Sequence, residues 1–128
     1  MSKRVKVAIS AYGPTECGSI EQEKRKFYTL LEDVISSCSR KFPLYICGDF
    51  NARVGPSDGV VVGPCTMLSE SQPNCNGDLL RHVAASKGFI CSSTFFAPSQ
   101  AKKATWKSSA GKSPRTGLVL ITSSPSTI

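Results

Sequence analysis

An aspartate and an asparagine follow a short apolar run, and together they could hold a phosphate and a water molecule. The stretch LYICGDFN places Asp49 directly after the run and Asn51 two residues later. A carboxylate at the end of a strand can orient a water, and Asn51 adds a donor and an acceptor. Strand geometry predicts that both side chains point to the same side. The alternative is an Asx-turn, in which they only shape the exit from the strand.

The residues before this pair are expected to form a strand, a helix and a second strand. Val5, Val7 and Ile9 alternate with polar or small residues, which predicts a half-buried strand ending at Gly13-Pro14. The run from residue 44 to 50 is nearly all apolar, as in a strand buried on both faces. A strand–helix–strand order favours a layered α/β arrangement.

The helix between these strands is predicted to begin after Ser19. Ser19 is a suitable N-cap, Gln22 completes a capping box, and acidic residues occupy the first turn. The apolar residues that recur at helical spacing predict one buried face, made of Phe27, Leu30, Leu31, Val34 and Cys38.

The second half of the chain has weaker patterns. Residues 53–73 are rich in proline and glycine and predict a long surface loop with a short strand at 59–62. A second helix follows, capped by Asn76 or Asp78 and ended by Gly88. Its inward residues are expected to be Leu79, Leu80, Val83 and Ala84. Short strands are expected at 89–91 and 105–106, and a last strand at 117–122.

Composition and charge indicate how many domains to expect and which kinds of partner the protein could have. The 128 residues suit one domain, and no apolar run is long enough to span a membrane. The first residues lack the pattern of a signal peptide, so we expect six reduced cysteines in an intracellular protein. A disulfide framework is the alternative. The net charge of +7 favours an anionic partner, with nucleic acid first, although ordinary solubility charge would look the same.

The order of several motifs resembles the endonuclease/exonuclease/phosphatase superfamily. The similar segments are ISAYGPT, FYTLLEDVI, GDFNARVG, NCNGDLLRHVAASKGFICSSTFF and ATWKSSAGK, which follow one another in the matching order and extend through most of the chain. They are most similar to the apurinic-type endonuclease domain of non-LTR retrotransposons and to the craniofacial-development-protein-2-like proteins derived from it. The resemblance implies part of a four-layer α/β sandwich with mixed, largely antiparallel sheets.

The resemblance also implies roles for individual residues. Asp49 matches the aspartate that orients or deprotonates the attacking water, and Asn51 matches the asparagine at the scissile phosphate. Tyr12 matches an active-site tyrosine, with packing on the sheet as the alternative. Asn76 and Arg53 are assigned to substrate binding, with helix capping as the alternative for Asn76. The implied cation is Mg²⁺ or Mn²⁺, held weakly by Asp49 and Asn51.

The sequence departs from the family pattern in three places. The family strands that carry an asparagine and a metal-binding glutamate would precede Val5, and Val119 stands where an aspartate is usual. The closing aspartate–histidine pair is also missing. His82 lies on the second predicted helix and matches no catalytic position, and Trp106 is assigned to the core.

These observations lead to two functional hypotheses. The first is metal-dependent phosphodiester hydrolysis by an endonuclease-type domain, weak or inactive in this chain. The second is a basic remnant that binds nucleic acid without cutting it, or is inert. Residues 1–122 are expected to form a partial domain and residues 123–128 a tail. DNA is the expected partner and the nucleus the expected location. A phosphoinositide or sphingolipid substrate is a third, lower-ranked reading.

Overall fold

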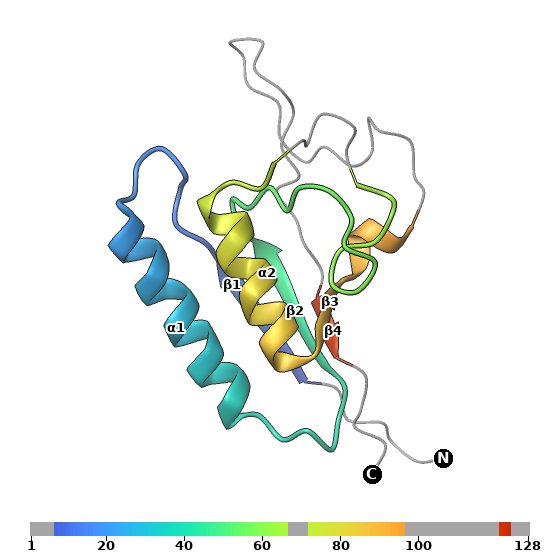
Figure 1. Cartoon of the computed structure of the whole chain (residues 1–128). Helices are drawn as coiled ribbons and strands as arrows, with labels where there is room; N and C mark the ends of the chain where they lie inside the picture. Colours follow the sequence, from blue (N-terminus) through green and yellow to red (C-terminus); the bar gives the residue numbers. More distant parts are fainter. Residues whose placement is uncertain (1–6, 67–71, 97–120, 124–128) are drawn as a thin grey trace.

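The computed structural model describes residues 7–66, 72–96 and 121–123, which form one sheet and two long helices (Figure 1). The elements in chain order are β1 (Val7–Tyr12), α1 (Glu21–Ser37), β2 (Leu44–Asp49), α2 (Cys75–Lys87), β3 (Phe89–Cys91), the short 3₁₀ helix η1 (Ser92–Phe95) and β4 (Ile121–Ser123). The predicted strands at 44–50 and 89–91 and both predicted helices are therefore confirmed.

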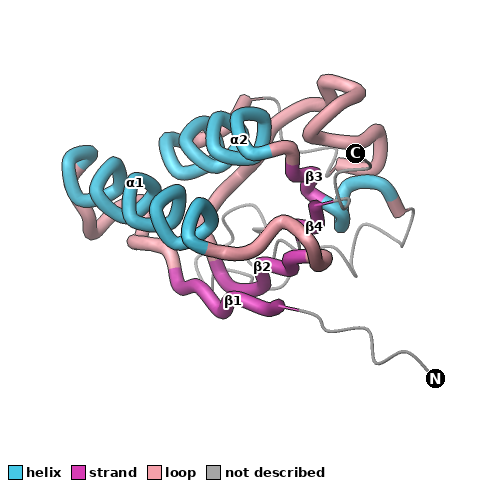
Figure 2. Tube along the Cα trace, turned by 90° about the horizontal axis from the view of Figure 1, so that it is seen from below, coloured by secondary structure: helices cyan, strands magenta, loops and turns pink. Residues whose placement is uncertain are grey.

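The four strands form a mixed sheet in the order β1-β2-β4-β3. β1 and β2 are parallel neighbours, whereas β4 runs antiparallel to both β2 and β3. Figure 2 shows α1 and α2 on the same face of this sheet. The expected mixed α/β class is therefore confirmed, and the described residues form one sheet and one helical layer.

The central strand β2 explains where the core lies. Leu44 and Ile46 are fully buried toward the helices, whereas Tyr45 and Cys47 on the opposite face are half-buried. The prediction of a strand buried on both faces is thus wrong for the second face, because the two helices of the described chain cover only the first. Buried side chains of α1, α2, β2 and β3 complete the core.

Helix α1 begins one residue later than predicted. Its N-cap is Ile20, whose backbone N–H donates to the Glu23 carboxylate at 3.3 Å. Ser19 and Gln22 therefore do not form the predicted capping box. The expected acidic first turn is present, with Glu21 and Glu23. The helix start was therefore predicted correctly to within one residue.

The buried face of α1 agrees with the prediction in part, because Leu31 is buried and Phe27 and Cys38 pack against the core. It consists of Lys24, Tyr28, Leu31 and Ile35, whereas Leu30 is 61% exposed. Apolar spacing alone did not separate this face from its neighbour, because Phe27, Leu30 and Val34 recur at the same helical spacing. Lys24 is buried against Glu16, and it shares the buried face with Tyr28, Leu31 and Ile35.

The N-cap of helix α2 differs from the prediction, whereas its C-cap is the predicted glycine. Asn74 is the N-cap, and its side chain accepts a hydrogen bond from the Gly77 N–H at 2.8 Å. The predicted caps Asn76 and Asp78 lie inside the helix. Gly88 ends the helix with a left-handed φ of 74°, as a C-terminal glycine does. Leu80, Val83 and Ala84 are buried as predicted.

The remaining predictions on strands have mixed outcomes. Residues 59–62 form no strand, and Val62 makes only an isolated bridge to Cys91. The last strand includes Ser123, so it extends one residue beyond the predicted strand and domain boundary. The predicted strand at 105–106, Trp106, Val119 and residues 117–120 lie outside the described residues.

Candidate functional site at the ends of β1 and β2

The carboxyl ends of β1 and β2 bring Tyr12 and Asp49 side by side. The two residues are partners in the parallel register, so their Cα atoms lie about 4.8 Å apart and their side chains share one face. That face is opposite the helices, because the alternate residues Val7, Ile9 and Ala11 pack on the core. Tyr12 is 73% exposed. It therefore stands beside Asp49 and is available to a ligand instead of packing on the sheet.

Asn51 reaches the same place by a route that strand geometry did not predict. β2 ends at Asp49, and Asn51 adopts a left-handed φ of 48°. Its backbone N–H donates to Asp49 Oδ1 at 2.9 Å, and its side-chain Nδ2 donates to the Gly13 carbonyl at 3.0 Å. The Gly13 N–H in turn donates to the Asp49 carbonyl at 2.6 Å. The Asx-turn alternative is therefore present, and the same contacts hold Asn51 next to Asp49 and Gly13.

Gly48 allows the two strands to approach so closely at this point. A Cβ atom on Gly48 would lie only 1.7 Å from the Ala11 carbonyl oxygen. No side chain fits there, so the glycine of the GDFN motif is required for the packing of β2 on β1 beside Asp49.

Two asparagines of the α2 N-terminus hold the loop after β2. Asn74 Nδ2 donates to the Asn51 carbonyl at 3.1 Å, and Asn74 Oδ1 accepts from the Arg53 N–H at 2.9 Å. Asn76 Nδ2 donates to the Pro14 carbonyl at 2.8 Å and to the Asn51 carbonyl at 3.4 Å. Asn76 is fully buried. It therefore supports the loop from beneath and does not face the surface, where a substrate would bind.

Arg53, which was predicted to bind substrate, lies two residues beyond Asn51 in the sequence. It is exposed, and its Nε donates to the Gln72 carbonyl at 3.2 Å. Its backbone carbonyl accepts from the Asn74 N–H at 3.1 Å, so both sides of its peptide are fixed by Asn74. An anchored, exposed guanidinium in this position suits contact with a phosphate.

Sequence reasoning missed the pair formed by Glu16 and Lys24. Lys24 is 5% exposed, and its ammonium lies 3.3 Å from Glu16 Oε1. The same carboxylate accepts hydrogen bonds from the backbone N–H groups of Cys75 and Asn76 at the start of α2. The only sequence signal was the place of Lys24 on the stripe continued by Tyr28 at helical spacing.

The described residues do not form a complete site for Mg²⁺ or Mn²⁺. No group of three His, Cys, Asp or Glu side chains lies close enough to hold a metal within the described ranges. Asp49 supplies one carboxylate, and Asn51 already uses its side-chain amide on Gly13. Glu16 is occupied by Lys24 and the α2 backbone. The predicted ligands Asp49 and Asn51 thus lie together without a further acidic partner among these residues.

Other reactive side chains do not stand at the ends of β1 and β2. All six cysteines are free thiols, and burial raises the pKa of Cys91 to about 12, so its thiol stays protonated at neutral pH. His82 is exposed on α2, as predicted. Burial, followed by the charge of Glu16, raises the pKa of Tyr28. None of these groups has the strand-end position of Asp49.

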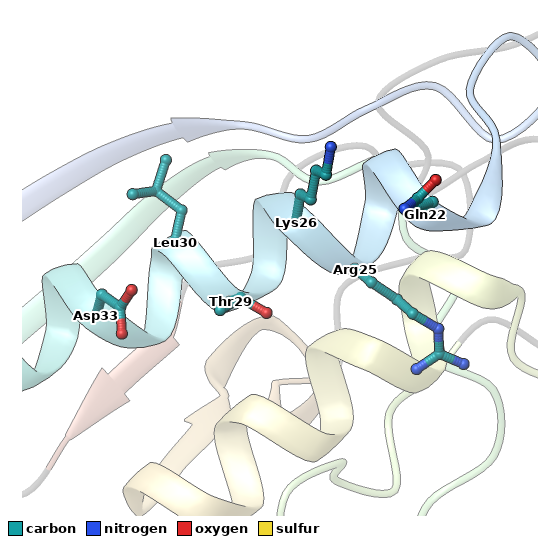
Figure 3. Close-up of a pocket in the computed structure, with 6 residues that line it drawn as sticks. All are labelled: Gln22, Arg25, Lys26, Thr29, Leu30 and Asp33. Carbon is teal, nitrogen blue, oxygen red and sulfur yellow. The ribbon is translucent and has the colours of Figure 1, made fainter.

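A pocket on the surface of α1 is separate from the strand-end site. Figure 3 shows that its lining comes from this one helix, namely Gln22, Arg25, Lys26, Thr29, Leu30 and Asp33. None of the predicted site residues takes part in it.

A comparison with protein-family models and with curated proteins found no match for this chain. Within the described part of the chain, neither helix combines the length and apolarity that crossing a membrane requires.

Proposed function

We propose that this chain is an endonuclease-type domain of the endonuclease/exonuclease/phosphatase superfamily and acts on the phosphodiester backbone of nucleic acid. The observation that carries the proposal is the meeting of Asp49, Asn51 and Tyr12 at the ends of two parallel strands. Ligand sites in open α/β sheets lie at such carboxyl ends. The four-layer sandwich and retrotransposon origin are part of the same proposal and rest on the motif order.

Asp49 is the proposed acceptor for the proton of the attacking water. Its Oδ1 is held by the Asn51 N–H at 2.9 Å. Among the described residues no donor contacts Oδ2, so this second oxygen is available to a water. A carboxylate held in one orientation with one free acceptor is suited to general-base catalysis.

Tyr12 and Arg53 are the proposed phosphate contacts. The Tyr12 side chain is exposed on the same face as Asp49, and its hydroxyl can donate to a phosphate oxygen. Arg53 is exposed two residues beyond Asn51 and offers a bidentate cation. The net charge of +7 would add sequence-independent attraction to the backbone.

The resemblance implies that a divalent cation would neutralise charge on the phosphate, but the described residues do not fit a full cation site. This observation favours a second candidate function, which is binding of nucleic acid without hydrolysis. The two candidates share the same phosphate contacts and differ in whether Asp49 supports a reaction.

Nicking of supercoiled plasmid, with Mg²⁺ or Mn²⁺ added, tests the first candidate. The first candidate predicts weak nicking by the wild-type chain and a loss of about a hundredfold in rate for Asp49→Ala, as when a general base is removed. Asp33→Ala is the matched control, since Asp33 is an exposed aspartate on α1. Nicking that survives in Asp49→Ala would refute the role of Asp49.

Binding measured in the same samples separates the two candidates. Binding without nicking, weakening steeply with salt and equal for unrelated sequences, would support the second candidate. Arg53→Met should then weaken binding and reduce its salt dependence. Absence of both nicking and salt-dependent binding would overturn both candidates.

A further inference from the structure

A nearly buried ion pair links three segments beneath the strand-end site. Glu16 lies in the turn after β1, Lys24 is in the first turns of α1, and their charged atoms are 3.3 Å apart. Lys24 Nζ also donates to the Glu16 carbonyl at 2.9 Å, so the lysine holds both the side chain and the backbone of Glu16. The Lys24 side chain is 7% exposed and that of Glu16 is 21% exposed.

The carboxylate of Glu16 is at the same time attached to the start of α2. Oε1 accepts from the Cys75 N–H at 3.2 Å and Oε2 from the Asn76 N–H at 3.4 Å. Negative charge is stabilised at a helix N-terminus, where free N–H groups gather. The pair therefore fixes where α2 begins relative to the turn after β1.

Asn76 connects the start of α2 to the strand-end site. Its backbone is held by Glu16, while its buried side chain donates to the carbonyls of Pro14 and Asn51. Asn51 is in a left-handed conformation and orients Asp49 through its N–H. A continuous series of contacts thus runs from Lys24 through Glu16, Asn76 and Asn51 to Asp49.

The burial of this pair is better explained by positioning than by stability. A buried ion pair loses hydration, and apolar residues of similar size often stabilise a protein equally well. A lysine in this place on the buried stripe of α1 therefore calls for another reason. The contacts of Glu16 with the N-terminus of α2 supply one.

We propose that Lys24 and Glu16 are positioning residues, which act through Asn76 to hold the Asn51–Asp49 turn in its site geometry. This inference rests on the proposed function for the role of the turn. The positioning itself is a separate property of the fold and can be measured without any reaction.

Amide hydrogen exchange, followed by NMR on the full chain, is the direct test. In Lys24→Met we expect the Asn51 and Gly13 amides, which contact neither Lys24 nor Glu16, to exchange about tenfold faster. The amides of Val61 and Val62, held by Asp58 in a separate loop, should keep their rates. Lys24→Arg should restore slow exchange, because it keeps the cation.

The pair of Arg25 and Glu21 offers a matched control. It lies on the exposed side of the same helix, with both side chains more than half exposed. Arg25→Met removes the same charge one residue further along and should leave Asn51 and Gly13 unchanged. Glu16→Gln, compared with Glu21→Gln, repeats the test from the acidic partner and remains informative if Lys24→Met fails to fold.

The outcomes distinguish this inference from the proposed function. Unchanged exchange at Asn51 in both Lys24→Met and Glu16→Gln would overturn the inference, even in a chain that nicks DNA. An equal acceleration at Asn51 and in the Asp58 loop would also overturn it, because it would show a general loss of stability. Faster exchange confined to Gly13 and Asn51 would support it, whether or not the chain cleaves or binds nucleic acid.

Discussion

Two aspartates of the described chain have different surroundings: Asp49 ends strand β2, and Asp58 lies in a loop that Arg81 of α2 contacts. Asp58 Oδ1 accepts hydrogen bonds from the backbone N–H groups of Val60, Val61 and Val62, and Oδ2 lies 3.2 Å from Arg81. Asp49 accepts one backbone N–H, that of Asn51, among the described residues. A carboxylate whose acceptors are all engaged shapes a loop, whereas one with a free oxygen is able to receive a proton.

The environments of the two loops agree with this distinction. Arg81 also donates to the carbonyls of Val54 and Pro56, so the loop that Asp58 closes is fixed to α2 by one guanidinium. The strand-end turn is held instead through its backbone, and Tyr12 and Asp49 remain at its surface. The first loop is thus closed by its own contacts, whereas the strand-end turn leaves the side chains on which the proposed function rests at the surface.

Gly48→Ala should have the largest effect on the strand-end region. The added Cβ would lie 1.7 Å from the Ala11 carbonyl oxygen, and the strands must separate to accept it. We expect a loss of about 3 kcal/mol or more in the free energy of unfolding, measured by urea denaturation. Gly59→Ala is a useful control, because no atom lies within 4 Å of its Cβ position, although its left-handed φ of 74° adds some strain. Equal losses in the two variants would contradict the close approach.

Asp58→Ala should destabilise the protein more than Asp49→Ala does. The first change leaves three loop N–H groups and Arg81 without their acceptor, which is expected to cost about 2 kcal/mol. The second removes one side-chain acceptor, with an expected cost below about 1 kcal/mol. Thermal or urea unfolding of both variants measures the difference. A larger loss in Asp49→Ala would reverse the assigned roles.

Acid should release the Asp58 loop in a predictable pH range. Burial raises the pKa of Asp58. The backbone N–H groups of Val60, Val61 and Val62 and the charge of Arg81 lower it by more, so the net pKa is below its usual value. The resulting stability is therefore fully present above the unfolded-state pKa, about 3.9. It is lost as pH falls through the lower pKa of the folded state. Unfolding measured against pH should show a shallower acid decline in Asp58→Asn, and an unchanged decline would contradict the assignment.

Of the six cysteines, Cys91 should be the slowest to be oxidised or alkylated. Its thiol is fully buried and its pKa is raised to about 12, so almost no reactive thiolate forms at neutral pH. In the native chain Cys91 should react with iodoacetamide last of the six cysteines, and exposed Cys17 should react early. Mass spectrometry after brief labelling measures the order. Rapid labelling of Cys91 would show that β3 opens readily.

The sequence predicted those features that depend on local chemistry. An apolar run defined β2, Gly88 ended α2, and the alternation of Val7 and Ile9 located most of β1. Tyr12 was assigned to the site of Asp49 only through the family resemblance, and the parallel register of β1 and β2 places the two residues side by side.

Features that depend on distant contacts could not be predicted in this way. Lys24 lies on the buried face of α1, where it forms an ion pair with Glu16 in the turn after β1. Asn51 leaves the strand path because of its bonds to Gly13 and Asp49. Asn74 replaces Asn76 as the cap of α2, since Asn76 is engaged by Pro14 and Asn51. In each case a contact with a residue outside the local element decides between the alternatives.

The most direct test of the account compares plasmid nicking by wild type, Asp49→Asn and Asp58→Asn at equal folded fractions. Both substitutions keep the size of the side chain and remove its charge. We expect a loss of about a hundredfold for Asp49→Asn and a rate close to wild type for Asp58→Asn. Equal rates in all three proteins, or a greater loss in Asp58→Asn, would contradict a catalytic role for the strand-end aspartate.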